Sequence, residues 1–140
     1  MTNRKEYLTM SETTDELRKA ASEYRTAVFD LGQKRTERDL AKRSLKEIEA
    51  SIFNSAVKQG TIDGKNAETR DAQSQLAFKA NTLWQSTFDQ YIVSEVDFAH
   101  AQDVLTVTLM ELKVAATLTN VEIAQTGATR LLSEVSLAGA

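Results

Sequence analysis

The feature that most constrains this chain is the complete absence of proline from its 140 residues. Proline ends or kinks helices, and glycine, the other common helix breaker, occurs only five times. Alanine, leucine, glutamate, lysine, arginine and glutamine are plentiful and favour helices, whereas aromatic residues are few. This composition predicts an all-α protein whose helices pack through narrow seams.

Apolar side chains in the first half recur about every 3.5 residues, as they do in a coiled coil. The repeat consists of Leu17, Ala21, Tyr24, Val28 and Leu31, and then of Leu45, Ile48, Ile52 and Ala56. Thr13 and Glu16 have the spacing of a capping box, and Gly60 stands where a C-cap glycine belongs. We predict one helix over residues 14–59, in which Gly32 costs roughly 1 kcal/mol without ending the helix.

The second half predicts another long helix, over residues 66–118. Its seam consists of Leu76, Ala80, Leu83, Thr87, Tyr91, Phe98, Gln102, Leu105, Leu109, Leu112 and Ala116. Gly127 is expected to separate a short C-terminal helical segment within residues 119–137. Two long helices with apolar stripes must fold back on each other, so we predict a single domain, residues 1–140, built as a long antiparallel hairpin. Such a hairpin exposes much of its seam, and we therefore expect an oligomer.

The segment GTIDGKNAETR, residues 60–70, allows two interpretations. A phosphate-binding P-loop has four residues between its glycines and a hydroxyl after its lysine, but here three residues separate the glycines and asparagine replaces the hydroxyl. A turn over residues 60–65, with Asn66 as the N-cap of the next helix, explains the same residues one by one. We therefore predict a bend, and keep Lys65 and Arg70 as a candidate anion site at the helix N-terminus.

Within this segment, GKNAETRDAQ resembles a pattern, GKNAexRxAQ, of small, mostly uncharacterised helical proteins encoded by tailed bacteriophages, where it also opens a second long helix. The matching residues are Gly64, Lys65, Asn66, Ala67, Glu68, Arg70, Ala72 and Gln73. The resemblance covers ten of the 140 residues. It implies a phage origin and brings no catalytic residue or cofactor with it.

A basic stripe interrupts the apolar repeat of the first predicted helix. It consists of Lys34, Arg35, Arg38, Lys42, Arg43 and Lys46. One interpretation is a surface for single-stranded nucleic acid, although the stripe lacks aromatic side chains for base stacking. Another is pairing with the acidic second helix, and a third is a merely solvated face. Folding the hairpin about residue 62 or 63 places Arg35 near Asp89 and Tyr91, and we favour pairing, within one chain or between chains.

The remaining candidate side chains concern metal binding, catalysis and an aromatic cluster. His100 lies at helical spacing from Asp97 and Asp103, but a metal site in a helical bundle needs more ligands than one histidine supplies, so we predict no metal. The chain has no cysteine, nucleophile elbow or glycine-rich oxyanion site, and we predict no enzyme and no cofactor. The aromatic concentration is assigned to the core or to an assembly interface: Leu83, Trp84, Phe88, Tyr91 and Phe98.

These patterns favour a non-enzymatic, self-associating helical protein that acts through protein–protein contacts. We expect it in the cytoplasm, or the host cytoplasm if it is phage-encoded, because the N-terminus lacks a signal peptide and no run of apolar residues spans a bilayer. Two alternatives stay open. One is a single-stranded DNA-binding accessory of recombination or replication, and the other a protein that sequesters a nucleotide or signalling molecule.

Overall fold

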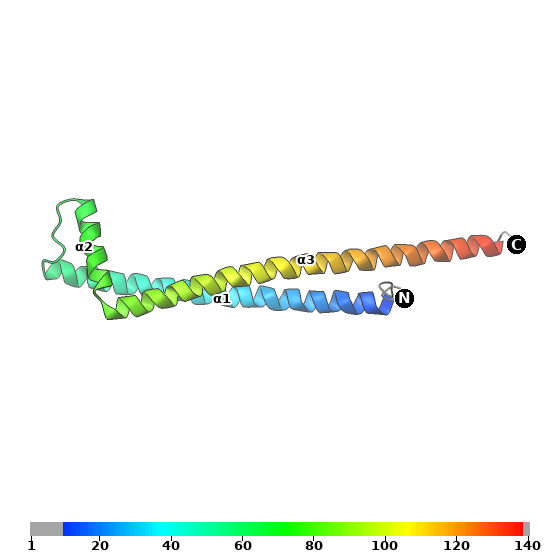
Figure 1. The fold of residues 1–140 in the computed structure, drawn as a ribbon, viewed down its shortest axis with the longest axis horizontal. Coiled ribbons are helices and arrows are strands. Elements are labelled where there is room, and N and C mark those ends of the chain that lie inside the picture. The colour runs from blue at the N-terminus through cyan, green and yellow to red at the C-terminus, as the bar shows by residue number, and fades with distance from the viewer. Residues whose placement is uncertain (1–9, 139–140) are drawn as a thin grey trace, which may run out of the picture. The chain divides into compact units, whose positions relative to one another are not determined.

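The computed structural model describes residues 10–138, and every regular element in this range is an α-helix. The helices are α1 (Met10–Lys58), α2 (Ala67–Lys79) and α3 (Thr82–Ala138), as Figure 1 shows. The prediction of an all-α fold is thus confirmed. Their contacts divide the chain into two units: unit 1 contains the described residues 10–29 and 103–138, and unit 2 contains residues 30–102.

Unit 2 has an aromatic core where α1 and α3 pack against each other beside α2. Leu45, Phe78 and Trp84 are buried together, and partly buried Ile48, Ile52, Phe88 and Tyr91 surround them. The Trp84 ring stacks on Phe78 with 6.0 Å between centroids and on Phe88 with 4.9 Å. Its indole N–H donates to Glu49 Oε1 of α1 at 3.2 Å, which satisfies the one polar atom of this side chain.

Unit 1 is held together by a thinner seam between α1 and α3. Thr13, Ala20 and Ala27 of α1 and Thr119 of α3 are its buried residues. The Thr119 hydroxyl donates to the Thr13 carbonyl oxygen at 3.4 Å, across 106 residues of sequence. Because the buried side chains are small, the two helices bury little apolar surface here.

The seam positions differ by one residue from two of those predicted. Ala20 and Ala27 are buried, whereas Val28 is 46% exposed. The spacing of Thr13, Ala20 and Ala27 is an exact heptad, and the sequence prediction instead chose the bulkier neighbouring residue. Apolar size therefore misled the assignment where the helices approach through alanine.

The second predicted helix is divided, and its C-terminal part is longer than expected. α2 ends at Lys79 with Ala80 as C-cap, and the Asn81 side chain accepts from the Trp84 N–H at 3.0 Å to start α3. α3 then continues through Gly127 to Ala138, so the separate C-terminal segment over 119–137 is not formed. An exposed glycine weakens a helix by only about 1 kcal/mol, which a helix of 57 residues tolerates.

Because α2 is a separate helix, the connection between the long helices occupies more of the chain than a turn about residue 62 or 63. The pairing register in unit 2 shifts accordingly: Arg38 contacts Glu95, with 4.0 Å between Nε and Oε1, and Arg35 lies over Phe98. The predicted register, with Arg35 near Asp89 and Tyr91, is therefore wrong by about two helical turns. The predicted antiparallel packing of the two long helices is found within each unit.

One property of α3 runs against the expectation of no membrane-spanning run. The stretch Thr82–Leu132 is long and apolar enough to cross a membrane by length and composition, because an 18-residue window within it has a mean hydropathy of 1.3. Length and composition alone are weak evidence, since they describe a helix that lies between other helices equally well. Little of the apolar stretch is buried in the chain itself.

Candidate functional site

The turn over residues 60–65 begins at the C-terminal end of α1, where the backbone conformation requires glycine. Gly60 has φ 77°, in the left-handed region, and its N–H donates to the Val57 carbonyl at 3.1 Å. The Thr61 N–H donates to the Ala56 carbonyl at 2.9 Å. These two bonds form a Schellman motif, and they confirm Gly60 as the residue that ends α1.

A glutamine side chain closes the loop that follows. Gln73 Oε1 accepts from the backbone N–H groups of Asp63 and Gly64, both at 3.0 Å, and Gln73 Nε2 donates to Asp63 Oδ1 at 2.7 Å. A phosphate held in a turn binds to backbone N–H groups of this kind. In this loop, two of them already donate to a side chain of the same chain.

The start of α2 accounts for two more residues of the turn. Asn66 Oδ1 accepts from the Thr69 N–H at 2.8 Å, so Asn66 is the N-cap, as predicted. A Cβ on Gly64 would lie 2.8 Å from Thr69 Cγ2 and 3.0 Å from the Arg70 nitrogen, so this position has no room for a side chain. Gly64, Asn66 and Gln73 thus each build the bend, which is the interpretation that the sequence favoured.

The two cations of the candidate anion site, Lys65 and Arg70, are both exposed. They flank a loop whose amide groups at Asp63 and Gly64 bind Gln73. An anion would therefore be held by two exposed side chains, which is a weaker arrangement than a ring of backbone N–H groups.

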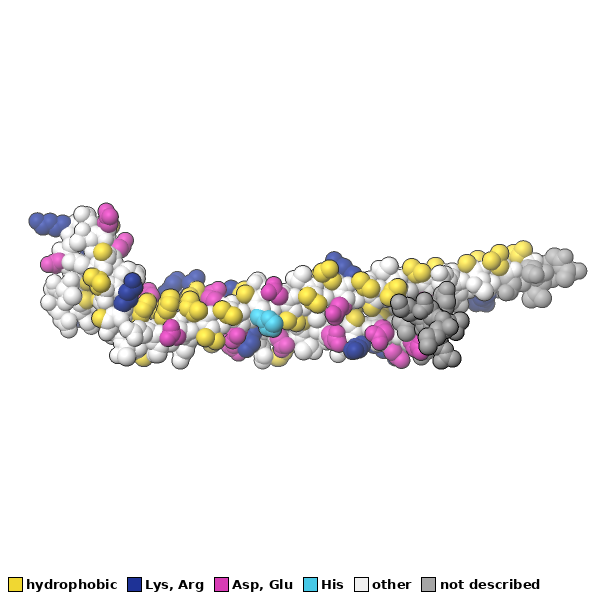
Figure 2. Space-filling view, viewed as in Figure 1, with side chains coloured by type: hydrophobic (Ala, Val, Ile, Leu, Met, Phe, Trp, Pro, Cys, Tyr) yellow, Lys and Arg dark blue, Asp and Glu magenta, His cyan; other side chains and the backbone are white. Residues whose placement is uncertain are grey.

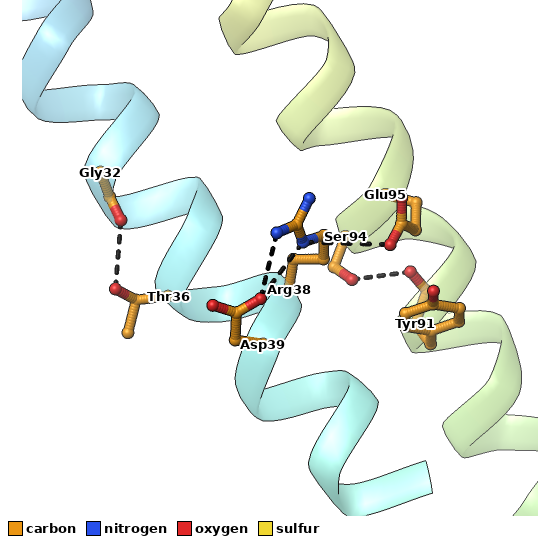
Figure 3. Close-up of polar contacts among 7 residues, drawn as sticks. All are labelled: Gly32, Thr36, Arg38, Asp39, Tyr91, Ser94 and Glu95. Atoms are coloured by element: carbon orange, nitrogen blue, oxygen red, sulfur yellow. Dashed lines mark hydrogen bonds and ion pairs between the residues drawn. The ribbon is translucent and has the colours of Figure 1, made fainter. Parts of the chain in front are cut away.

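Arg38 of the basic stripe is directed toward α3, as Figure 3 shows. Its guanidinium lies 4.0 Å from the centre of the Phe98 ring, pairs with Asp39 Oδ1 at 3.2 Å and reaches Glu95 Oε1 of α3. A guanidinium over an aromatic face and beside carboxylates is held by cation–π and ionic attraction together. Pairing of the stripe with acidic α3 inside one chain is therefore observed for this residue.

Glu95 also binds the neighbouring tyrosine of the same helix. Hydrogen bonding of the Tyr91 hydroxyl to Glu95, followed by partial burial, raises the pKa of Tyr91 above its ordinary value. The Ser94 hydroxyl donates to the Tyr91 carbonyl at 2.6 Å and is buried in the seam (Figure 3). Arg38, Tyr91, Ser94 and Glu95 form a polar layer between apolar layers, and we call these four residues the polar layer.

Arg35 also lies over the Phe98 ring, 6.0 Å from its centre, whereas Lys42, Arg43 and Lys46 are exposed on α1. Lys34 pairs with Glu37 at 3.1 Å, and this hydrogen bond raises the pKa of its ammonium group. Lys42, Arg43 and Lys46 border an open groove of about 490 Å³ along α1, together with Asp39, Glu47 and Ala50. Two carboxylates among three cations leave this groove a small positive charge, well below that of a typical nucleic-acid surface.

The predicted interface residues are divided between the interior and the surface. Trp84 and Phe98 are buried and Phe88 and Tyr91 are half-buried, all within unit 2, whereas Leu83 is 62% exposed. The four aromatic side chains thus serve the core of the chain itself. Leu83 is the most exposed residue of this set.

His100 is exposed, and in residues 10–138 no three histidine or acidic side chains come together as metal ligands would. Asp97 is half-buried and Asp103 exposed.

A groove in unit 1 was not predicted from the sequence. Its volume is about 750 Å³, and it lies between the first turns of α1 and the outer side of α3. One wall is formed by Val107, Met110, Val114 and Leu118 of α3. With Val121, which lies beyond the groove, they make an apolar stripe, 47% to 61% exposed, that we call the outer stripe. Figure 2 shows hydrophobic side chains at the surface along α3. The sequence does carry this apolar repeat, because the residues recur every three or four positions. The seam residues of the same helix recur with the same period, and the prediction followed that repeat instead.

The opposite wall of this groove is polar. Glu16, Lys19 and Glu23 of α1 line it, and Ala20 lies at its floor. An apolar floor bordered by charged side chains at helical spacing is the surface that an additional amphipathic helix fits.

Comparison of the chain with protein-family models, with curated proteins and with solved structures gives no match in any of the three.

Proposed function

We propose that this protein is a non-enzymatic helical assembly module that self-associates and acts through protein–protein contacts. The observation that carries the proposal is its exposed surface, 10731 Å² for a chain of 15.5 kDa. A compact monomer of this mass exposes about 7,200 Å², so the chain exposes about 3,500 Å² in excess. A standard interface covers only about 800 Å² on each partner.

The quality of the core supports the same proposal. Among the described residues, no large side chain is less than 2% exposed, and many large apolar side chains are more than half exposed. A two-helix seam has no interior in which a side chain is surrounded on every side. Further helices from other molecules would supply that interior.

A membrane is a poorer partner for the apolar part of α3. Residues 104–121 contain Glu111 and Lys113 near their middle. At 100° per residue these side chains point in almost opposite directions, so they cannot pair with each other, and each costs about 2.5–3.5 kcal/mol at the bilayer centre. We therefore propose a cytoplasmic location, in the host cytoplasm if the GKNAETRDAQ resemblance reflects a phage origin.

The DNA-binding alternative retains one supporting observation, the three outward cations Lys42, Arg43 and Lys46. The nucleotide-sequestering alternative loses support, because Gln73 binds the amide groups that a phosphate would use.

Light scattering of the purified protein at low and high salt, with and without a single-stranded oligonucleotide, tests the proposal. We expect an oligomer that persists at high salt, because apolar contacts are not screened, and that ignores the oligonucleotide. A monomer at every concentration would refute self-association. A heavier, salt-sensitive species that forms only with the oligonucleotide, and is lost in Lys42→Glu/Lys46→Glu, would favour the DNA-binding alternative.

A further inference from the structure

We infer that the outer stripe of α3 is the interface between two copies of this chain, with the α3 helices packed antiparallel about a two-fold axis at Val114. This inference rests on the self-association proposed above and assigns it a surface, an orientation and a register. The outer stripe consists of Val107, Met110, Val114, Leu118 and Val121, and all of it belongs to unit 1.

In unit 1, α3 is apolar on two faces, which indicates a helix that lies between other helices. Its inner face packs on α1 through Thr119, while the outer stripe remains exposed. Over residues 12–26, the exposed side chains of α1 are polar or charged, with Glu16, Lys19 and Glu23 among them. A helix that is apolar on two sides is a central helix, whereas a helix with one apolar face is peripheral. Two α3 helices at the centre, each flanked by one α1, satisfy both patterns.

The period of the outer stripe identifies a helix as the occupant. Its residues follow one another at intervals of three, four, four and three, which is close to the 3.5-residue repeat of a coiled-coil seam. Helices pack side by side when both present such a repeat. Within residues 10–138, the outer stripe is itself the longest exposed apolar repeat of this kind in unit 1, so a second copy is the partner that the chain supplies.

Charge decides the orientation. In a parallel pair, each residue faces its own copy, which would set Glu111 against the second Glu111. In an antiparallel pair centred on Val114, Glu111 faces Thr117 instead, and like charges are not opposed. The same register sets Val107 against Val121 and Met110 against Leu118, so that each apolar residue of the stripe meets another.

The available area agrees with an interface of this kind. The excess exposed surface of about 3,500 Å² per chain exceeds the roughly 800 Å² that each partner buries in a standard complex. Even a helix–helix contact over the outer stripe alone therefore leaves surface for further association, and it does not require any rearrangement of the seam.

Single cysteines test the register directly, because the chain has no cysteine of its own. A disulfide needs two Cα atoms within about 7 Å. In Val114→Cys the two thiols meet at the two-fold axis, so mild oxidation should give a covalent dimer. In Met110→Cys the two thiols are displaced by about 12 Å along the helices, and neither this variant nor Leu118→Cys should cross-link to itself. An equal mixture of these two variants should cross-link, because Met110 faces Leu118.

The control for random collision is Leu83→Cys, which is as exposed as Val114 but lies in unit 2. Self-cross-linking of all three stripe variants alike would indicate parallel packing and overturn the inference. If light scattering shows an oligomer but no stripe variant cross-links above the Leu83→Cys background, the inference fails while the proposed self-association stands. A monomer by light scattering refutes both.

A charge substitution provides an independent test. Val114→Glu places two carboxylates against each other at the two-fold axis and should weaken dimerisation by about 100-fold in sedimentation equilibrium. Because Val114 is 60% exposed in the single chain, its helical circular dichroism should be retained. Leu83→Glu is the matched control and should leave the dimer intact. An unchanged dissociation constant in Val114→Glu would overturn the inference, as would a monomer that floats with phosphatidylglycerol vesicles.

Discussion

The same two helices build a different seam in each unit. In unit 2, α1 and α3 enclose an aromatic cluster around Trp84 and the polar layer around Arg38. In unit 1, they meet through Thr13, Ala20 and Thr119 and leave the outer stripe exposed. The core of unit 2 is supplied by the chain itself, whereas we propose that the exposed apolar surface of unit 1 is covered by a partner. Substitutions in unit 2 should therefore change folding stability, and substitutions on the outer stripe should change assembly.

The largest effect is expected from Trp84→Ala, which removes the side chain that stacks on two rings and binds Glu49. Loss of a buried aromatic side chain costs roughly 3–5 kcal/mol of the free energy of unfolding. Urea denaturation followed by circular dichroism measures this change. Leu83→Ala, one residue away and exposed, should stay within about 0.5 kcal/mol of the wild type. Equal losses in the two variants would contradict the assignment of Trp84 to the core.

Next in size is Gly64→Ala, whose Cβ would collide with Thr69 and the Arg70 backbone. Backbone displacement at this packed turn should destabilise the protein by about 1–3 kcal/mol. Gly32→Ala is the opposite case, because Gly32 lies inside α1 with open space around its Cα, and it should stabilise by about 1 kcal/mol. Thermal unfolding should show a lower melting temperature for Gly64→Ala and a higher one for Gly32→Ala. An unchanged melting temperature in Gly64→Ala would refute the close contact of this position with Thr69 and Arg70.

A smaller effect is expected from Arg38→Met, which keeps an unbranched side chain over Phe98 but removes the charge from the polar layer. Glu95 and Arg38 are partly exposed, so the free energy of unfolding should fall by only about 1 kcal/mol. Arg35→Met is the matched control, because Arg35 lies 6.0 Å from the same ring. An equal or larger loss in Arg35→Met would mean that the polar layer does not hold the register.

The smallest effect is a pH dependence of unit 2. The pKa of Tyr91 is raised by Glu95, so its contribution to stability is fully present below the ordinary tyrosine pKa of about 10 and is lost as the pH rises through the higher folded-state value. The melting temperature of the wild type should therefore fall more between pH 9 and about pH 11 than that of Tyr91→Phe. Identical slopes in the two proteins would contradict the hydrogen bond.

Local signals in the sequence predicted the parts of the fold that local chemistry determines. Gly60 and Asn66 act within one turn of a helix end, and their roles as C-cap and N-cap follow from residue type and position. The antiparallel packing followed from two apolar repeats joined by a short connection. Pairing of the basic stripe with the acidic helix was favoured and is found for Arg38, although the register predicted for Arg35 was wrong.

What could not be predicted depends on contacts between residues distant in the sequence. Gln73 reaches back ten residues to Asp63, and nothing in its neighbourhood marks it as the residue that closes the loop. Asn81 interrupts an apolar repeat that predicts one continuous helix. Its side chain accepts from the Trp84 N–H, and this cap fixes where α3 begins. The outer stripe was overlooked because one helix carries two apolar repeats with nearly the same period.

The hydrogen bonds between α1 and α3 in the two units differ in the number of residues that separate their partners in the sequence. Trp84 reaches Glu49 across 35 residues, whereas Thr119 reaches Thr13 across 106. The longer loop costs about 1 kcal/mol more to close, and residues 103–138 on its C-terminal side are synthesised after unit 2. During synthesis, unit 2 can fold while residues 103–138 are still being made. The apolar outer stripe thus emerges onto a chain that already has a folded core, which shortens the time for which it is exposed beside unfolded segments.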